Sequence, residues 1–259
     1  LLIADPLTAF AKQGFQTTYG INMIKAWFSS LSYVFSYFFD LSGYANMAIG
    51  LGLMFNIKLP INFNSPYRSR NFAEYWNRWH ITLSRFLGDY VFRSIHKKGD
   101  KPFKFYYAVF ITFLVSGFWH GSGWNFIIWG ILNGIFVIFA HAMIRSKKSL
   151  PYLLAWFLTF MGVIITRIFF VSKSLKQGFL YTYHLISFKT FDWLSIKQIP
   201  FQQFFLIVVS FFIVFALPNA HQLKEKFKPN WEFALLTIIL LILSIFQMNN
   251  VADFLYFQF

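Results

Sequence analysis

The chain has 259 residues, of which 57% are hydrophobic and 12% are charged, and its net charge is +14. Soluble domains carry about 25% charged residues, so this composition excludes an ordinary soluble domain and indicates an integral membrane protein with several spans. The basic residues lie in short clusters between apolar runs, as in cytoplasmic loops, and not on the soluble basic face that reads nucleic acid, so we expect no nucleic-acid partner.

The first long apolar stretch covers residues 21–55 and contains Asp40 and Gly43. About 20 residues cross a bilayer as a helix, so the stretch is too long for one straight span and too short for two. We therefore expect Asp40 and Gly43 to lie at a kink, a helix end or a cavity. For Asp40 the alternative is a helix cap near the lipid headgroups.

Residues 71–95 combine polar and aromatic side chains. The larger apolar side chains recur with the spacing of one helical face: Phe72, Trp76, Trp79, Leu83, Phe86 and Tyr90. This spacing predicts one amphipathic helix that lies in the membrane interface or packs against the spans. His80 flanks the stripe and can point inward, although a single histidine here is more often structural than reactive.

Basic clusters at residues 93–104, 145–148 and 224–228 separate the later apolar runs. Lys and Arg in short loops resist translocation, so we expect all of these clusters to face the cytoplasm. Between the first two clusters the chain must leave and return, and residues 105–119 are few for a full span. We therefore expect His120 at the turn of a membrane hairpin, within the bilayer or toward its outer side.

Further spans are expected at residues 151–171, 203–217 and 231–248. A mixed loop at 172–200 should hold a short amphipathic helix, and the alternation of spans places this loop and the tail, 249–259, in the periplasm. The expected fold is all-α: a polytopic transmembrane helical protein with an interfacial amphipathic helix and a hairpin that carries His120.

The residues around His120 carry the main functional signal. The imidazole stands between two apolar runs, with Gly117, Gly121 and Gly123 around it. An ionisable ring in such surroundings is costly unless it has a role, and glycines let the backbone bend and let ligands come close. The alternative is a histidine at the membrane interface, beside the aromatic belt residue Trp119.

His80 and His120 each follow a tryptophan. Two imidazoles in a membrane cavity suit proton transfer near neutral pH, with one taking a proton from a hydroxyl while the other orients or polarises. The chain has no cysteine, no nucleophile-elbow serine and no histidine spacing typical of zinc sites, so we expect no metal site.

Several blocks in order resemble the membrane-bound O-acyltransferase superfamily, in its bacterial polysaccharide-acylating branch. The blocks are Asp40-Leu-Ser-Gly-Tyr-Ala-Asn-Met-Ala-Ile-Gly; Asn62-Phe-Asn-Ser-Pro; Tyr75-Trp-Asn-Arg-Trp-His-Ile-Thr-Leu-Ser with Asp89-Tyr90; and Gly117-Phe-Trp-His-Gly. The later Thr166-Arg-Ile-Phe-Phe also fits. Family members are usually much longer, with further N-terminal spans, so residues 1–259 are expected to be a single domain that corresponds to the C-terminal part of one.

The resemblance implies that His120 is the catalytic histidine and that His80 is the second active-site residue, around a cavity that crosses the membrane. The expected substrate-binding residues lie in or beside the same blocks: Asp40, Trp76, Asn77, Trp79 and Trp119. No cofactor is bound in such proteins; the acyl donor, expected to be acetyl-CoA, enters from the cytoplasm. The acceptor is a hydroxyl of an exported polysaccharide, alginate-like or peptidoglycan. A periplasmic O-acetyltransferase or esterase-like partner completes delivery, at the inner membrane of a bacterium.

The sequence indicates the acyl group less strongly than it indicates the family. Acetylating members often carry a Pro-Leu-Gly-Gly-like stretch after the Asp-Tyr pair, whereas here Val91-Phe-Arg-Ser-Ile-His follows, which is closer to the D-alanyl transfer proteins of teichoic acid synthesis. The spans after Arg167 and the Phe-Gln-Phe ending favour acetyl, which we expect, with D-alanyl transfer as the alternative. A non-catalytic membrane scaffold for polysaccharide export is the alternative from another class, but a scaffold has no need of an imidazole in an apolar hairpin.

Overall fold

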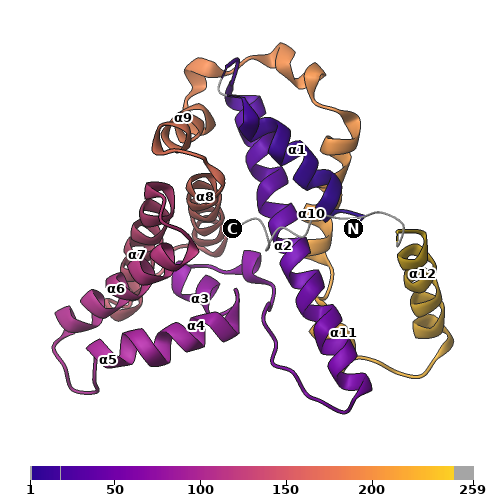
Figure 1. The fold of residues 1–259 in the computed structure, drawn as a ribbon, viewed down its shortest axis with the longest axis horizontal. Coiled ribbons are helices and arrows are strands. Elements are labelled where there is room, and N and C mark those ends of the chain that lie inside the picture. Colours follow the sequence, from indigo (N-terminus) through magenta and orange to yellow (C-terminus); the bar gives the residue numbers. More distant parts are fainter. Residues whose placement is uncertain (1, 18, 248–259) are drawn as a thin grey trace.

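The computed structural model of the protein describes residues 2–17 and 19–247, and the regular structure in these ranges is entirely helical (Figure 1). Short 3-10 turns lie at Pro66–Arg68, Phe188–Thr190 and Trp193–Gln198, and a π-helical turn at Gly88–Phe92. The α-helices are α1 (Ala4–Gln16), α2 (Met23–Met54), α3 (Phe72–Trp76), α4 (Ile81–Leu87), α5 (Arg93–Ile95), α6 (Pro102–His120), α7 (Trp124–Arg145), α8 (Tyr152–Val171), α9 (Leu175–Ile186), α10 (Phe201–Ala216), α11 (Ala220–Glu225) and α12 (Trp231–Gln247).

Among the described helices, α6, α7 and α8 are long and apolar enough to cross a membrane. The expected class, an all-α polytopic membrane protein, is therefore confirmed. The expected spans at 203–217 and 231–248 correspond to the apolar helices α10 and α12, whose described parts have 16 and 17 residues. The mixed loop holds α9, as expected. The tail, 249–259, lies outside the described residues.

Helix α2 is the centre of the arrangement and packs against α1, α8, α9 and α10 (Figure 1). Helix α7 of the α6–α7 hairpin packs against α8. The short helices α3 to α5 lie below the hairpin in Figure 1. Helix α12 stands at the opposite edge, and most of its side chains are exposed. The long helices thus form one bundle, and the short segments 72–95 close one end of it.

Helix α2 corrects one expectation, because residues 23–54 form a single helix without a break. Its 32 residues correspond to a length of about 48 Å, well beyond the roughly 30 Å of a hydrocarbon core. Asn22 caps its start, since the Asn22 side chain accepts from the Lys25 backbone N–H at 3.0 Å. Asp40 and Gly43 lie in its interior, so the helix-end and cap interpretations of Asp40 are wrong. Leu, Met and Ala around them favour helix strongly enough to tolerate the glycine.

Residues 71–95 do not form the single amphipathic helix that we expected. Helix α3 ends at Trp76, and His80 adopts a left-handed backbone conformation (φ 43°, ψ 54°) before α4 begins. Because this break rotates the second half of the segment, the predicted stripe does not continue: Phe86 and Tyr90 are 55% and 70% exposed. The periodicity was genuine, but tertiary contacts at the break override it.

The α6–α7 hairpin is confirmed, with residues 121–123 as its turn. The helices pack backbone to backbone: a Cβ at Gly130 would lie 2.5 Å from the Phe113 carbonyl oxygen, and a Cβ at Gly117 would lie 2.5 Å from that of Phe126. Such close approach is possible only for glycine and is typical of membrane helix pairs. The hairpin brings the basic residues at 93–104 and 145–148 to the same end. The side of the membrane that this end faces stays a prediction.

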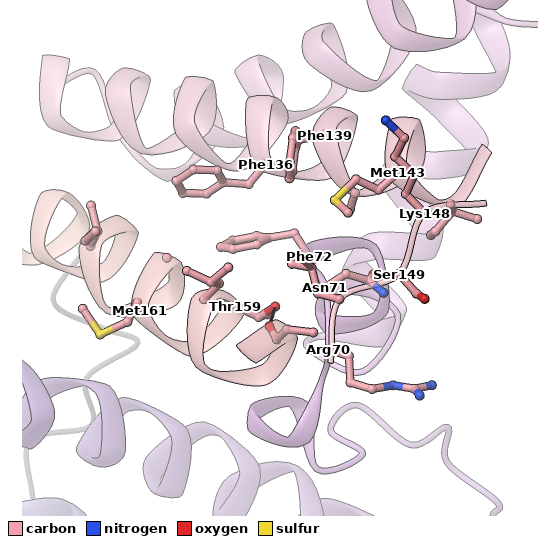
Figure 2. Close-up of a pocket in the computed structure, with 17 residues that line it drawn as sticks. Arg70, Asn71, Phe72, Phe136, Phe139, Met143, Lys148, Ser149, Thr159 and Met161 are labelled. Carbon is pink, nitrogen blue, oxygen red and sulfur yellow. Dashed lines mark hydrogen bonds between the residues drawn. The ribbon is translucent and has the colours of Figure 1, made fainter. Parts of the chain in front are cut away.

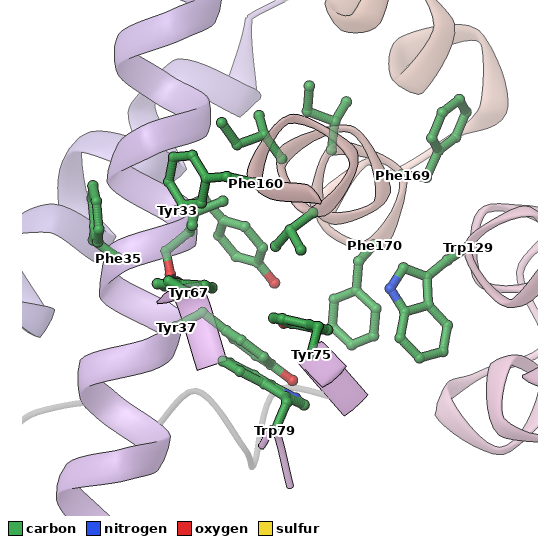
Figure 3. Packing of buried hydrophobic residues seen from close by; sticks show 14 of the residues in the cluster. Tyr33, Phe35, Tyr37, Tyr67, Tyr75, Trp79, Trp129, Phe160, Phe169 and Phe170 are labelled. Atoms are coloured by element: carbon green, nitrogen blue, oxygen red, sulfur yellow. Dashed lines mark hydrogen bonds between the residues drawn. The ribbon is translucent and has the colours of Figure 1, made fainter. Parts of the chain in front are cut away.

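The core between α2 and α8 is mainly aromatic (Figure 3). Tyr67 is 2% exposed, donates its hydroxyl to the Val34 carbonyl at 2.7 Å and packs edge-on against Phe160. Its own carbonyl accepts from the Trp156 indole at 2.9 Å. These bonds satisfy polar groups in a region without water and fix the rings that surround the candidate site.

Candidate active site

His120 is the last residue of α6, and the chain departs from the helix at Gly121. Its imidazole meets the rings of Trp119, Trp129 and Phe170 edge to face, with centroid distances of 5.0, 5.1 and 5.0 Å. These rings come from three different helices or helix ends, so the orientation of the imidazole depends on the packing of α6 against both α7 and α8. His120 therefore links the end of α6 at the hairpin turn to both α7 and α8.

His80 is held at the break by two backbone hydrogen bonds to an earlier loop. The Asn64 N–H donates to the Arg78 carbonyl at 2.9 Å, and the Ile81 N–H donates to the Asn62 carbonyl at 3.0 Å. The Asn62 side chain also accepts from the Thr82 hydroxyl at 2.6 Å. A left-handed conformation costs an L-residue about 1–2 kcal/mol, and these bonds on both sides of His80 offset that cost.

The His80 ring borders a cavity of about 480 Å³ between α2 and residues 59–63. The cavity wall on α2 is apolar and includes Leu41 and Tyr44, from the first resemblance block. The Nδ1 atom of His80 is buried and has no hydrogen-bond partner within the described ranges. Burial lowers the pKa of the His80 imidazole below its usual value, with a smaller contribution from the nearby Arg167 charge. The ring is therefore neutral at pH 7 and retains an unused nitrogen.

The structure brings His80 and His120 into one neighbourhood, although 40 positions separate them in the sequence. Both His80 and Arg167 lie close enough to His120 to act electrostatically on its charge. In residues 2–17 and 19–247, no three His, Asp or Glu side chains cluster in a way that could hold a metal ion. The arrangement thus places two imidazoles in the field of one fixed positive charge.

Arg167 is the residue that sequence reasoning missed. It is 3% exposed, and its guanidinium carbon lies 4.6 Å from the ring centre of Tyr37 and 4.5 Å from that of Trp79. Its Nη2 donates to the Tyr75 hydroxyl at 3.3 Å. Phe170 contacts both this guanidinium, at 5.4 Å, and the His120 ring. An arginine inside the apolar run of α8 was the available signal, because a buried charge in a membrane helix marks a site by default.

The expected substrate-binding residues fall into two groups. Trp79 is 3% exposed and stacks against the rings of Tyr37 and Tyr75 (Figure 3), and the Arg167 guanidinium lies over its ring. Trp76 donates its indole N–H to the Asn133 side chain at 3.3 Å and packs against Trp129. These two tryptophans therefore lie behind residues near His120: Trp76 packs behind Trp129, and Trp79 packs beside Arg167.

The side chains of the other three expected residues are more exposed than that of Trp79. Trp119 contacts His120 but is 56% exposed. Asn77 is exposed and lines a separate cavity of about 280 Å³, whose wall includes Ser84 and neither candidate histidine. Asp40 is half-buried on α2. Trp76 lines the same cavity as Asn77, and within the described residues the lining of the cavity at His80 includes none of the five expected substrate-binding residues.

Comparison with known proteins points to one family. The sequence model of the membrane-bound O-acyltransferase family matches residues 1–181. A peptidoglycan O-acetyltransferase of Helicobacter pylori is 46% identical over 69% of this chain and 34% of its own length. A probable alginate O-acetylase of Pseudomonas aeruginosa is 36% identical over 74% of this chain and 37% of its own. A teichoic acid D-alanyltransferase of Streptococcus thermophilus is 40% identical over 46% of this chain and 30% of its own. The chain therefore spans about a third of the length of these curated relatives.

Proposed function

The chain belongs to the membrane-bound O-acyltransferase family, and on that premise we propose that it passes an acyl group, acetyl, toward hydroxyls of an exported polysaccharide. The observation that carries the proposal is the His120 imidazole at the hairpin turn, beside His80 and a buried Arg167. We propose His120 as the catalytic base. His80 is its partner at the cavity on α2, and Trp79 packs against the Arg167 guanidinium.

The proposed reaction is an acyl transfer from a thioester donor, acetyl-CoA. His120 takes the proton of the accepting hydroxyl while that oxygen forms a bond to the acyl carbon and the carbon–sulfur bond breaks. The proton then passes to the departing thiolate, so atoms and charge balance. The Arg167 guanidinium supplies a fixed positive charge near the developing oxyanion, in surroundings that exclude water and strengthen its effect.

Acetyl is favoured over D-alanyl by the extent of the similarity. The two acetylating relatives match 69% and 74% of the chain, whereas the D-alanyltransferase matches 46%. The proposed acceptor is alginate-like or peptidoglycan, after the names of those relatives. We further propose an inner-membrane location and a periplasmic O-acetyltransferase or esterase-like partner. The organisation of residues 1–259 as one domain stays a prediction.

The test is acyl transfer in membranes that contain the protein, with labelled acetyl-CoA as donor and retained label on the glycan as readout. Loss of a general base typically lowers the rate about 10²- to 10⁴-fold, which is the effect expected of His120→Ala. His80→Ala and His80→Gln separate lost chemistry from lost packing. The matched control is His141→Gln: His141 is also a partly buried histidine in the hairpin, and it lines the cavity of Asn77.

Near-normal acetylation in a stably inserted His120→Ala protein would overturn the catalytic assignment. It would then favour the alternative of a non-catalytic scaffold for polysaccharide export. Transfer of D-alanyl but not acetyl would instead retain the family chemistry and correct the acyl group.

A further inference from the structure

A second, larger cavity lies away from the histidines, between α7, α8 and the start of α3 (Figure 2). Its volume is about 520 Å³. Phe136 on α7 and Phe72 form its inner wall, with ring centres 4.6 Å apart. Phe136 lies seven residues, or about 10 Å, along α7 from Trp129, the wall of the His120 site. The cavity is therefore not a part of the candidate active site.

The walls of this cavity are apolar, and the cavity opens at the side of the helix bundle. Phe139, Ile144 and Leu158 line it and are 63%, 56% and 50% exposed. Both helices that carry these residues are candidate membrane spans by length and composition, and we therefore expect this side to face the hydrocarbon of the bilayer. An occupant of the cavity must be apolar over most of its length.

The mouth of the cavity is positively charged. Arg70 and Lys148 line it from opposite sides, with Asn71 and Ser149 between them (Figure 2). Arg70 is 60% exposed at its side chain, and its contact with Glu74 is long, at 3.7 Å, while Glu74 pairs more closely with Arg78, at 2.9 Å. The Arg70 guanidinium thus retains donors for a further anion.

The end of α7 fixes the backbone of Lys148 beside this cavity. The Lys148 N–H donates to the Met143 carbonyl, and the Lys147 N–H donates to the Ile144 carbonyl, both at 3.1 Å. Together with the left-handed conformation of Lys147 (φ 55°), these bonds form a Schellman ending, which folds the chain back over the last turn. The backbone of Lys148 is therefore fixed beside the cavity, and its exposed side chain can extend to an anion at the mouth.

We propose that this cavity binds one anionic phospholipid, with its acyl chains along the apolar wall and its phosphate between Arg70 and Lys148. Charge complementarity selects the occupant: a neutral lipid leaves the cations without a partner, and a free phosphate leaves the apolar walls unfilled. A basic residue near a membrane surface contributes about 1 kcal/mol toward an anionic lipid. Two such contacts correspond to a roughly 30-fold preference.

The test places the protein in nanodiscs of phosphatidylcholine, alone or with one fifth phosphatidylglycerol, and measures retained lipid by native mass spectrometry. We expect a roughly 30-fold preference for phosphatidylglycerol, which is lost in the double variant Arg70→Gln, Lys148→Gln. The matched control is Arg145→Gln, Lys147→Gln, which removes the same charge from the end of α7 beside Lys148 but outside the cavity lining. The melting temperature in pure phosphatidylcholine verifies that each variant is folded.

A steric variant distinguishes the cavity from general surface charge. Ala155 lines the cavity on α8, and Ala155→Phe should abolish the preference while leaving both cations in place. Equal losses in the lining and control pairs, or a preference that survives Ala155→Phe, would overturn the proposal. Retention of inorganic phosphate by the protein in phosphatidylcholine discs, lost in the Arg70→Gln, Lys148→Gln variant, would also overturn it, because the site would then take a phosphate without a lipid.

Discussion

Replacing Gly130 by alanine tests whether the contact between α6 and α7 sets the position of His120. The added Cβ would lie 2.5 Å from the Phe113 carbonyl oxygen and 3.3 Å from the Gly117 Cα. Both neighbours are backbone atoms, so neither can rotate away as a side chain would. The two helices must move apart.

The size of the effect follows from this geometry. Carbon–oxygen contacts between helices are ordinarily about 3.3–3.6 Å, so α6 and α7 must separate by roughly 0.8–1.1 Å. Overpacking of this kind costs about 1–3 kcal/mol, offset by about 1 kcal/mol of better helix propensity. His120 lies one turn beyond Gly117, and a misplacement of about 1 Å can lower a catalytic rate about 100-fold. We therefore expect Gly130→Ala to reduce acyl transfer roughly 10- to 100-fold.

The matched control is Gly50→Ala on α2. Gly50 is exposed, helical, and has nothing within 4 Å of its added Cβ, so alanine should raise stability by up to about 1 kcal/mol and leave transfer unchanged. The assays are the melting temperature in nanodiscs and the transfer of labelled acetyl. If Gly130→Ala matches Gly50→Ala in both, the hairpin packing does not position the imidazole and the reasoning fails.

Three further predictions concern the backbone, the titration and the topology. Burial lowers the pKa of His80, so the unfolded chain binds a proton there more readily than the folded chain. The stability that the neutral, buried ring contributes is therefore complete above about pH 6.5 and is lost as the pH falls. The melting temperature of His80→Gln should therefore decline less between pH 7 and pH 5 than that of the parent protein, and identical slopes would count against the buried neutral ring. Lys147→Gly should raise the melting temperature by a few degrees, because glycine avoids about 1 kcal/mol of left-handed strain; a lower value would contradict the Schellman ending. An impermeant thiol reagent applied to spheroplasts should label Lys189→Cys but not Lys98→Cys or Ser146→Cys, and the chain has no native cysteine to obscure the result. Labelling of either of the latter two would reverse the predicted hairpin.

The sequence predicted the elements that depend on local patterns. The glycines beside His120 and the two apolar runs indicated a hairpin because helix length and hydrophobicity can be read along one segment. The break at His80 was not predictable in this way. Its causes are hydrogen bonds to Asn62 and Asn64, which lie in an earlier loop, and no periodicity within residues 71–95 records them.

In the candidate site too, some features could be predicted from the sequence and others depend on contacts between distant segments. His80 and His120 could be identified from residue type and setting, and the structure places them near one another. The environment of Arg167 could not, because its partners Tyr37 and Trp79 come from separate segments that only the fold brings together. Its presence in an apolar run was visible, but the aromatic enclosure that keeps a buried cation in place was not.

The left-handed backbone at His80 has a practical consequence for engineering the protein. Positions 80 and 147 both hold a residue at positive φ, and a search for heat-resistant variants would favour glycine at each, since glycine adopts that conformation without a penalty. At Lys147 the exchange removes only an exposed side chain. At His80 it would remove the imidazole that borders the cavity on α2. If His80 has the role proposed above, libraries selected for thermal stability alone would enrich inactive proteins, so mutagenesis should leave position 80 fixed.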